Sequence, residues 1–599
     1  MWKKIKLILK SVREYKVPAL LTPLFMVGEA AMECALPLVM SKFVDKIEVV
    51  SDVKELWMYI VALVLMAALS LTCGILGGRT AAIASTGLAK NLRSDLFKKI
   101  QSFSFENIDK FSNSSLVTRM TIDVTDTQQA FQMCTRIVVR APLMFIFSAI
   151  MAFIIGGNMA WIFVCIIPFV AFGLLLIMKL AMPIFKRVFK QYDALNESIQ
   201  ENVSGIRVVK SYVREDFEQE KFNRASTNMA KEFIKAERIL AFNNPLMNFS
   251  IHLSNILVCT FGAVLIFKTA NPIPDPENPG KTIIEWGALS VGQLSSLLTY
   301  GVQILMALMM VSMIIVMLSL SLEAINRIAE VLEEEPTIKN PENPLYELDD
   351  GSITFRNVSF KYRETAEKYT LENINISIQS GQFIGIIGST GAGKTSLINL
   401  ISRLYDINEG ELDVGGHPVQ AYDLETLRNN VAVVLQKNVL FSGSIIENLR
   451  WGDINASEEE VINACKIAQA DDFVTSFPDG YNTHIEQGGS NVSGGQKQRL
   501  CIARALLKKP KILILDDSTS AVDTKTDKLI RMGLRKDIPD TTKIVIAQRI
   551  SSIEDADQII VLDNGHIDQI GTHEELLKTN KIYQEVYYTQ NKKDGEEDE

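Results

Sequence analysis

The chain has 599 residues, of which 47% are hydrophobic, and carries a formal net charge of −9. This length leaves room for several domains. Its lysines and arginines form no strongly basic segment, which argues against a nucleic-acid-binding protein. The acidic stretch at residues 591–599 is expected to be a solvated tail.

The seven cysteines form neither a CxxC pair nor the spacing of a disulfide framework. Most of them stand in apolar sequence, where a small polarizable side chain simply packs. This pattern argues against a metal cluster and fits a reducing, cytosolic side. The cysteines are Cys34, Cys73, Cys134, Cys165, Cys259, Cys465 and Cys501.

The N-terminal residues are basic and precede a long apolar run. A cleavable signal would have a shorter apolar core and a small-residue cleavage site. We therefore expect residues 2–16 to form an amphipathic helix on the cytosolic membrane surface. The basic side chains of this segment are Lys3, Lys4, Lys6, Lys10, Arg13 and Lys16.

A transmembrane domain is predicted over residues 1–322. A helix needs about 20 mostly apolar residues to cross a bilayer, and six segments satisfy this requirement. They are approximately residues 17–40, 56–84, 137–156, 159–182, 240–267 and 290–318. Lysine and arginine crowd the long loops 85–136 and 183–239, so the positive-inside tendency places these loops and both termini in the cytosol.

The two long cytosolic loops keep helical periodicity and contain few helix breakers. They are expected to continue the membrane helices as rigid arms that reach several tens of Å into the cytosol. Such arms would act as levers that join the membrane domain to a soluble domain. The alternative is a plain helical hairpin without a mechanical role. Residues 323–347, with Pro336 and two Asn-Pro steps, have linker chemistry. A soluble α/β domain is predicted over residues 348–590, starting with a β-rich stretch at 352–360.

Residues 388–396 match the phosphate-binding pattern GxxxxGK[ST]. They follow an apolar strand at 383–387 and precede a helical stretch, which is the context that the motif requires. The backbone N–H groups of such a loop and the following helix N-terminus bind the phosphates of ATP. Lys394 would reach the β- and γ-phosphates, and the Thr395 hydroxyl would bind Mg²⁺. The motif consists of Gly388, Ser389, Thr390, Gly391, Ala392, Gly393, Lys394, Thr395 and Ser396.

The apolar strand at residues 511–515 ends in two acidic residues. Asp516 is the expected Mg²⁺-side carboxylate of a P-loop ATPase. The next position, Asp517, normally holds the carboxylate that polarises the attacking water.

Residues 491–499 read Asn-Val-Ser-Gly-Gly-Gln-Lys-Gln-Arg and resemble the LSGGQ signature of ABC ATPases. The resemblance implies that this segment binds the γ-phosphate of a nucleotide held by an opposite chain. Two nucleotide domains would then form a dimer with ATP between them. The signature residues are Val492, Ser493, Gly494, Gly495 and Gln496.

Other motifs of the family follow the expected order. Tyr362 stands where an aromatic ring stacks on adenine, and Gln436 where a glutamine senses Mg²⁺ and the transmembrane helices. The loop from Ser520 to Asp523 stands where the two nucleotide domains communicate. Residues 571–576 resemble the closing segment of the domain.

The membrane half also resembles the six-helix exporter fold, notably at residues 205–215. The resemblance covers nearly the whole chain. It implies an all-α six-helix transmembrane domain with long cytosolic extensions, followed by an α/β P-loop ABC ATPase domain with a helical subdomain.

Two positions depart from the family pattern. Asp517 replaces the usual glutamate and withdraws the carboxylate by about 1 Å, a misplacement that costs about 10²-fold in a positioned reaction. Gln548 replaces the switch histidine that touches the γ-phosphate; an amide forms hydrogen bonds but gains no proton. Because both losses affect hydrolysis, this site is expected to bind ATP and hydrolyse it slowly, with tolerated drift as the alternative.

A homodimer would repeat this defect in both sites, whereas a heterodimer would combine the intact signature with a partner's glutamate and histidine. The chain resembles the degenerate-site half of bacterial heterodimeric ABC exporters, many of which are multidrug pumps. We therefore expect a second half-transporter chain as partner, a location in the cytoplasmic membrane in contact with its lipids, and an amphipathic drug-like or lipid cargo. A lipid or peptide exporter and an ATP-binding regulatory subunit are the alternatives.

Polar residues and methionines in the membrane segments bear on which cargo the chain would transport. Glu29 and Glu33 share one helix face and would attract cationic drugs, or else lie near a mouth or pair with an arginine. A polar stripe in the fifth segment would line a cavity or join helices by hydrogen bonds. Methionines on one side of the sixth segment would line a promiscuous cavity or pack in the core. The stripe is Asn244, Asn248, His252 and Asn255, and the methionines are Met306, Met309, Met310, Met313 and Met317.

Overall fold

The structure, a computed structural model, describes residues 2–49, 53–269, 271–274, 282–285, 287, 289–364, 366–518 and 521–594. Ser520 and the tail residues 595–599 lie outside the described residues. The chain divides into two compact units, one of residues 1–101 and 113–334 and the other of residues 102–112 and 335–599. The two units are described separately.

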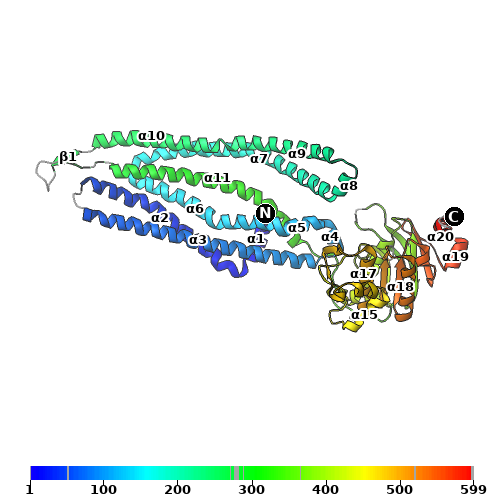
Figure 1. Cartoon of the computed structure of the whole chain (residues 1–599). Coiled ribbons are helices and arrows are strands. Elements are labelled where there is room, and N and C mark those ends of the chain that lie inside the picture. The colour runs from blue at the N-terminus through cyan, green and yellow to red at the C-terminus, as the bar shows by residue number, and fades with distance from the viewer. Residues whose placement is uncertain are drawn as a thin grey trace. The chain divides into compact units, whose positions relative to one another are not determined.

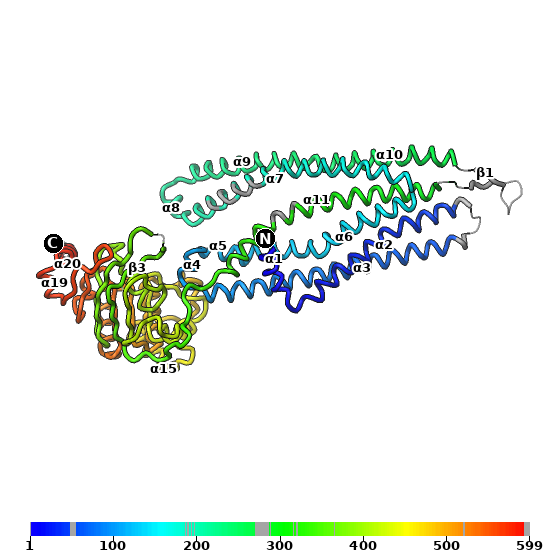
Figure 2. Tube along the Cα trace, turned by 180° about the vertical axis from the view of Figure 1, so that it is seen from behind, coloured from blue at the N-terminus to red at the C-terminus, as the bar shows by residue number. Residues whose placement is uncertain are grey.

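The first unit is helical (Figure 1). Its helices are α1 (Trp2–Leu9), α2 (Lys16–Val49), α3 (Val53–Gln101), α5 (Asn113–Thr118), α6 (Val124–Gly156), α7 (Trp161–Ser204), α8 (Ile206–Ser211), α9 (Glu215–Leu240), α10 (Asn243–Thr269) and α11 (Val291–Glu333). A short hairpin of β1 (Asn271–Pro274) and β2 (Thr282–Glu285) lies between α10 and α11. Figure 2 shows α2 beside α3, and α9 beside α7.

Five helical stretches of the described residues are long and apolar enough to cross a membrane. One of them, residues 113–185, contains both the third and the fourth predicted crossings. A 3₁₀ turn at Gly157–Ala160 separates these crossings, and Gly157 adopts φ = +47°, which glycine tolerates best. The helices run well past the predicted crossings: α3 has 49 residues, which corresponds to about 74 Å at 1.5 Å per residue.

Two sequence expectations differ from the observed elements. The predicted surface helix 2–16 consists of α1 and a 3₁₀ segment, Lys10–Tyr15, with a kink at Arg13 (φ = +40°). The predicted linker begins inside α11, which continues to Glu333. Its glutamate-rich end favours helix, and Pro336 follows shortly after the helix stops.

The two membrane glutamates are paired with an arginine, as one of the alternatives foresaw. Arg140 of α6 donates to both carboxylate oxygens of Glu33 of α2, at 2.7 and 2.9 Å, and lies 3.5 Å from Glu29. The buried hydroxyl of Tyr300 on α11 donates to the carbonyl of Cys34 at 2.7 Å. These bonds join α2, α6 and α11 into one packed group.

The second unit is an α/β domain with two sheets. A six-stranded sheet has the order β14-β13-β5-β12-β11-β8, with every neighbouring pair parallel except β14 with β13. An antiparallel sheet has the order β4-β3-β6-β7. Along β11, Ile512 and Ile514 enter one hydrophobic core while Leu513 and Leu515 enter the other, so this strand is buried on both faces.

The bounds of the second unit's elements are as follows. The strands of the two sheets are β3 (Ile353–Phe360), β4 (Leu371–Ile378), β5 (Phe383–Gly388), β6 (Glu409–Val414), β7 (His417–Pro418), β8 (Val431–Val434), β11 (Ile512–Asp516), β12 (Thr542–Ile546), β13 (Gln558–Asp563) and β14 (His566–Gly571), and β9 (Gly443–Ser444) pairs with β10 (His484–Ile485). The helices are α4 (Phe105–Phe111), α12 (Lys394–Ile401), α13 (Leu424–Asn430), α14 (Ile445–Leu449), α15 (Glu458–Ile467), α16 (Asp471–Ser476), α17 (Gly494–Leu507), α18 (Thr524–Asp537), α19 (His573–Thr579) and α20 (Lys581–Asp594).

Helix α4 belongs to the second unit, although the sequence assigned residues 85–136 to one arm of the membrane domain. Tyr405 donates a hydrogen bond to Asp109 of α4 at 2.7 Å and packs on Phe105, with ring centroids 6.2 Å apart. Asn107 donates to the carbonyl of Glu335 at 3.0 Å. The tip of the first arm is thus an integral part of the nucleotide-binding unit.

Candidate nucleotide site

Four adjacent parallel strands carry the predicted nucleotide residues at their carboxyl ends. β5 leads into the loop 388–393, β11 ends at Asp516, β12 precedes Gln548, and β8 precedes Gln436. The carboxyl ends of parallel strands meet at one edge of a sheet, which is where open α/β sheets bind ligands. Residues far apart in the sequence therefore meet at one edge.

These residues line a single cavity of about 720 Å³. Its walls include Gly388, Ser389, Thr390, Gly391, Ala392, Gly393, Lys394, Thr395, Ser396, Gln436, Asp516, Asp517 and Gln548. Three residues of the last helix, Ile582, Glu585 and Val586 of α20, also line it. The volume suits a nucleotide.

The loop geometry depends on its glycines. Gly391 and Gly393 have φ = +87° and +97°, in the region that disfavours other residues. A Cβ on Gly393 would lie 2.7 Å from Leu371. The amine of Lys394 donates to the carbonyls of Gly388 and Ser389 at 2.7 and 2.9 Å, and burial lowers the pKa of Lys394. The loop is therefore wrapped around its own lysine.

The predicted magnesium ligands lie together. The Thr395 hydroxyl donates to the carboxylate of Asp516 at 3.0 Å, and Gln436 borders the same cavity. Hydroxyl, carboxylate and amide oxygens are hard ligands that Mg²⁺ accepts beside phosphate and water. Burial raises the pKa of Asp516, and a bound cation would favour its ionised form. The residues fit Mg²⁺ bound together with ATP, and the metal would neutralise phosphate charge.

Asp517 is held by two of the other predicted site residues. Its carboxylate accepts hydrogen bonds from the amide of Gln548 at 2.8 Å and from Gln436 at 3.4 Å. The Asp517 backbone has φ = +48° and donates to the carbonyl of Ile546 at 3.0 Å. Burial raises the pKa of Asp517. The Gln548 amide thus engages the carboxylate of Asp517 directly.

The last helix holds the segment that carries Gln548, a contact that sequence motifs did not indicate. The amide of Gln590 on α20 donates to the carbonyl of Gln548 at 2.8 Å and accepts from the N–H of Ile550 at 2.9 Å. A side-chain amide that bonds the backbone at two nearby positions fixes the segment between them. Gln590 therefore restrains residues 548–550, which we call the switch segment.

An aromatic cluster connects the phosphate loop to α4. The Tyr362 hydroxyl lies 2.8 Å from the Ser396 hydroxyl, and its ring meets Tyr405 edge-on at 5.0 Å. Tyr405 in turn bonds Asp109 of α4, which together with burial raises the pKa of Tyr405. Tyr362 thus lies beside the phosphate loop but is absent from the described cavity walls, so its assignment to adenine stacking stays a prediction. Tyr405 and Asp109 were missed because their partners lie far away in the sequence.

The signature residues lie outside this cavity. Ser493 caps α17 in a capping box with Gln496, and Asp523 caps α18 by accepting from the N–H of Thr526 at 2.9 Å. A Cβ on Gly495 would lie 2.8 Å from the carbonyl of Ala521. Val492, Ser493, Gly494, Gly495, Gln496 and Asp523 are absent from the described cavity walls. The signature segment is therefore separate from the nucleotide cavity in this chain.

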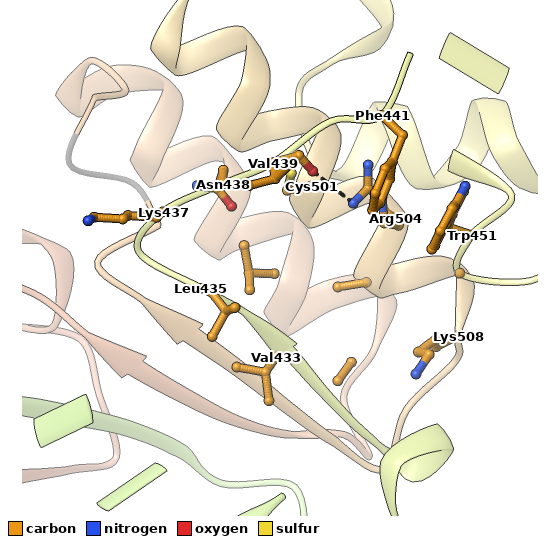
Figure 3. Close-up of a pocket in the computed structure, with 14 residues that line it drawn as sticks. Val433, Leu435, Lys437, Asn438, Val439, Phe441, Trp451, Cys501, Arg504 and Lys508 are labelled. Atoms are coloured by element: carbon orange, nitrogen blue, oxygen red, sulfur yellow. Dashed lines mark hydrogen bonds between the residues drawn. The ribbon is translucent and has the colours of Figure 1, made fainter. Parts of the chain in front are cut away.

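The same domain has a second pocket, of about 350 Å³ (Figure 3). Its lining includes Leu435 and Lys437, the residues on either side of Gln436 in the sequence. The rings of Phe441 and Trp451 stack there at 4.1 Å, and 62% of Trp451 is exposed. Arg504 lies beside these rings and donates to the carbonyl of Val439 at 3.1 Å (Figure 3). Exposed stacked aromatics of this kind are typical of a surface that binds another protein segment.

Comparison with known proteins gives two family matches. Residues 20–275 match the ABC transporter transmembrane region, and residues 371–520 match the ABC transporter nucleotide domain. An uncharacterized ABC transporter ATP-binding protein of Bacillus subtilis, YfiB, is 33% identical over 98% of this chain and 99% of its own length. The uncharacterized ABC transporter ATP-binding protein Rv1273c of Mycobacterium tuberculosis is 35% identical over 86% of this chain and 85% of its own length.

A solved structure, a bacterial Atm1-family ABC exporter with ATP bound, shares the fold with a TM-score of 0.79. It is 24% identical, and the match covers 97% of this chain and 98% of the other. The nucleotide domain indicates an ATPase coupled to transport. The chain belongs to the ABC transporters, as an exporter-type half-transporter.

Proposed function

We propose that this chain is one half of a heterodimeric exporter of amphipathic small molecules in the cytoplasmic membrane, with both termini in the cytosol. It binds ATP and Mg²⁺ in a hydrolytically impaired site and contributes its signature segment to the partner's active site. ATP binding closes the two nucleotide domains, and hydrolysis in the partner's site resets them. The observation that carries this proposal is the hydrogen bond from Gln548 to Asp517.

Hydrolysis at this site is impaired for three reasons. The carboxylate of Asp517 stands one methylene short of a glutamate's reach, and the Gln548 amide already occupies one of its oxygens at 2.8 Å. An amide also gains no proton, so Gln548 brings no positive charge to the developing phosphate charge. By contrast, the binding residues Lys394, Thr395 and Asp516 retain the groups that hold ATP and Mg²⁺.

The proposal of a partner chain rests on exposed surfaces. In α10, Asn244, Asn248 and His252 are exposed, whereas Met247 and Ser250 on the other side of the helix are buried. Amides do not face lipid, so this stripe faces a second membrane domain or an aqueous cavity. The pocket beside Trp451 and the separate signature half-site support the same conclusion, because each would be completed by another chain.

Turnover of ATP tests this function. The chain alone, the chain co-expressed with candidate partner half-transporters, and each pair with Asp517→Glu plus Gln548→His in this chain are assayed for ATPase activity. We expect a nearly inactive lone chain and an active pair that loses activity when the partner's catalytic glutamate is replaced. Fast turnover by the lone chain, unchanged by the double substitution, would refute the asymmetric mechanism. Absence of cargo stimulation in any active pair would favour a regulatory subunit.

A further inference from the structure

A pocket of about 300 Å³ in the membrane unit lies between α6 and α11. Three methionines, Met133, Met310 and Met313, and the isoleucines Ile137 and Ile314 line it together with two arginines, Arg136 and Arg140. Methionine side chains adapt to varied apolar shapes. The pocket is therefore an apolar chamber whose only charged walls, among the described residues, are guanidinium groups.

The two arginines differ in their partners. Arg140 is neutralised by Glu33 and Glu29, which lie on α2 and are absent from the described lining. Arg136 has no ion pair or hydrogen bond among the described residues, although it is half-buried. One turn of helix separates the two residues, so both face the same side of α6. Arg136 therefore presents an uncompensated positive charge to the pocket.

Arg136 stands one residue before the third predicted crossing, so its guanidinium faces an apolar pocket at the cytosolic end of that crossing without a partner among the described residues. A planar guanidinium binds carboxylate, sulfate or phosphate through two parallel hydrogen bonds. We propose that this pocket binds the cargo, and that the cargo is an amphiphile with an anionic head held by Arg136 and an apolar tail packed on the methionines. This proposal rests on the proposed export function and specifies its substrate class.

The same geometry opposes a cationic cargo. Glu29 and Glu33, the carboxylates that would attract a cation, both contact Arg140 and are absent from the described lining of the pocket. A cation in the pocket would face the guanidinium groups of Arg136 and Arg140, which line it. The exposed fraction of Met313, 67%, leaves the pocket open on the α11 side for an amphiphile to enter.

Binding of a matched pair of probes tests the proposal. The co-expressed transporter is placed in nanodiscs of phosphatidylcholine, which bears no net charge, and titrated with 11-(dansylamino)undecanoic acid and with the same dansyl chain ending in trimethylammonium. We expect the carboxylate probe to bind at least about 10-fold more tightly, and Arg136→Gln to weaken its binding about 10-fold, in line with a charge-assisted hydrogen bond. Arg136→Lys keeps the charge but loses the two parallel hydrogen bonds, so it should retain only part of the affinity.

Arg238→Gln is the matched control, since Arg238 is an exposed arginine of α9 outside the pocket. It should leave the affinity for both probes unchanged. Replacing part of the phosphatidylcholine with phosphatidylglycerol distinguishes two sources of the anion: competition with the probe indicates a lipid head group, and no competition indicates a free organic anion.

Equal or tighter binding of the trimethylammonium probe would overturn the proposal, as would unchanged carboxylate binding in both Arg136→Gln and Arg136→Ala. ATPase activity of the same nanodiscs separates the two levels of inference. An inactive wild-type complex argues against the export function, whereas an active complex without charge preference argues only against the anionic cargo.

Discussion

Replacing Gln590 tests whether the last helix positions the switch segment. Gln590→Ala removes two hydrogen bonds to backbone, one to the carbonyl of Gln548 at 2.8 Å and one from the N–H of Ile550 at 2.9 Å. Each net bond contributes about 0.5–1.5 kcal/mol, so the segment loses about 1–3 kcal/mol of restraint. Helix α20 keeps its other anchors, such as the buried Tyr583.

The released segment moves Gln548 away from Asp517 and leaves that carboxylate less restrained. The assay is ATP binding and residual ATP turnover at this chain's site, measured separately in the co-expressed complex after the partner's catalytic glutamate has been replaced. We expect turnover to change by about 5-fold or more, since 1 kcal/mol corresponds to about a factor of 5, while the affinity for ATP changes less than 2-fold. Turnover should change in either direction, because losing the Gln548 contact frees the carboxylate but also disorders it.

Gln584→Ala is the matched control on the same helix. Gln584 donates to the carbonyl of Leu577 at 2.8 Å and makes no bond to the switch segment. This variant should therefore leave both quantities unchanged. Equal behaviour of the Gln590 and Gln584 variants would refute a positioning role for Gln590.

Three further predictions follow from the same site. Tyr405→Phe removes the hydrogen bond to Asp109 at 2.7 Å. It should lower the free energy of unfolding, measured by denaturation, by about 1–2 kcal/mol. It should also reduce cargo stimulation of the ATPase more than basal activity, measured on the same preparation. Gly393→Ala places a Cβ 2.7 Å from Leu371 at φ = +97°; it should weaken ATP binding at least 10-fold in a nucleotide-binding assay, at a strain of about 1–3 kcal/mol. Burial raises the pKa of Asp517, so this carboxylate becomes protonated at a less acidic pH than an exposed aspartate. Residual turnover at this site, isolated by inactivating the partner's glutamate, should therefore fall as the pH is lowered through that raised pKa. An identical pH profile in Asp517→Asn would contradict this prediction.

Sequence reasoning located the nucleotide site because each motif is local. Residues 388–396 carry their own strand, loop and helix context, and the apolar strand before Asp516 is readable without a partner. Topology then brings four strand ends together, which motif order alone does not show. The resemblance to ABC exporters supplied the assembly of these motifs into one site.

Long-range pairs could not be predicted in the same way. Gln590 is 42 residues from Gln548, and Asp109 is 296 residues from Tyr405. Nothing in the local pattern of a glutamine or a tyrosine identifies such a partner. The pairing of Glu33 with an arginine was one of several open alternatives for the same reason. The sequence shows which residues share a helix face, but it does not show which helix packs against that face.

The central claim is that this chain holds ATP without hydrolysing it while the partner's site turns over. The direct measurement is photolabelling of the co-expressed complex with 8-azido-ATP carrying ³²P at either the α- or the γ-phosphate, under turnover conditions with Mg²⁺. The label reports the chain whose phosphate loop holds the nucleotide. The account predicts that this chain retains the γ-label while the partner retains only the α-label. Loss of the γ-label from this chain as fast as from the partner would contradict it.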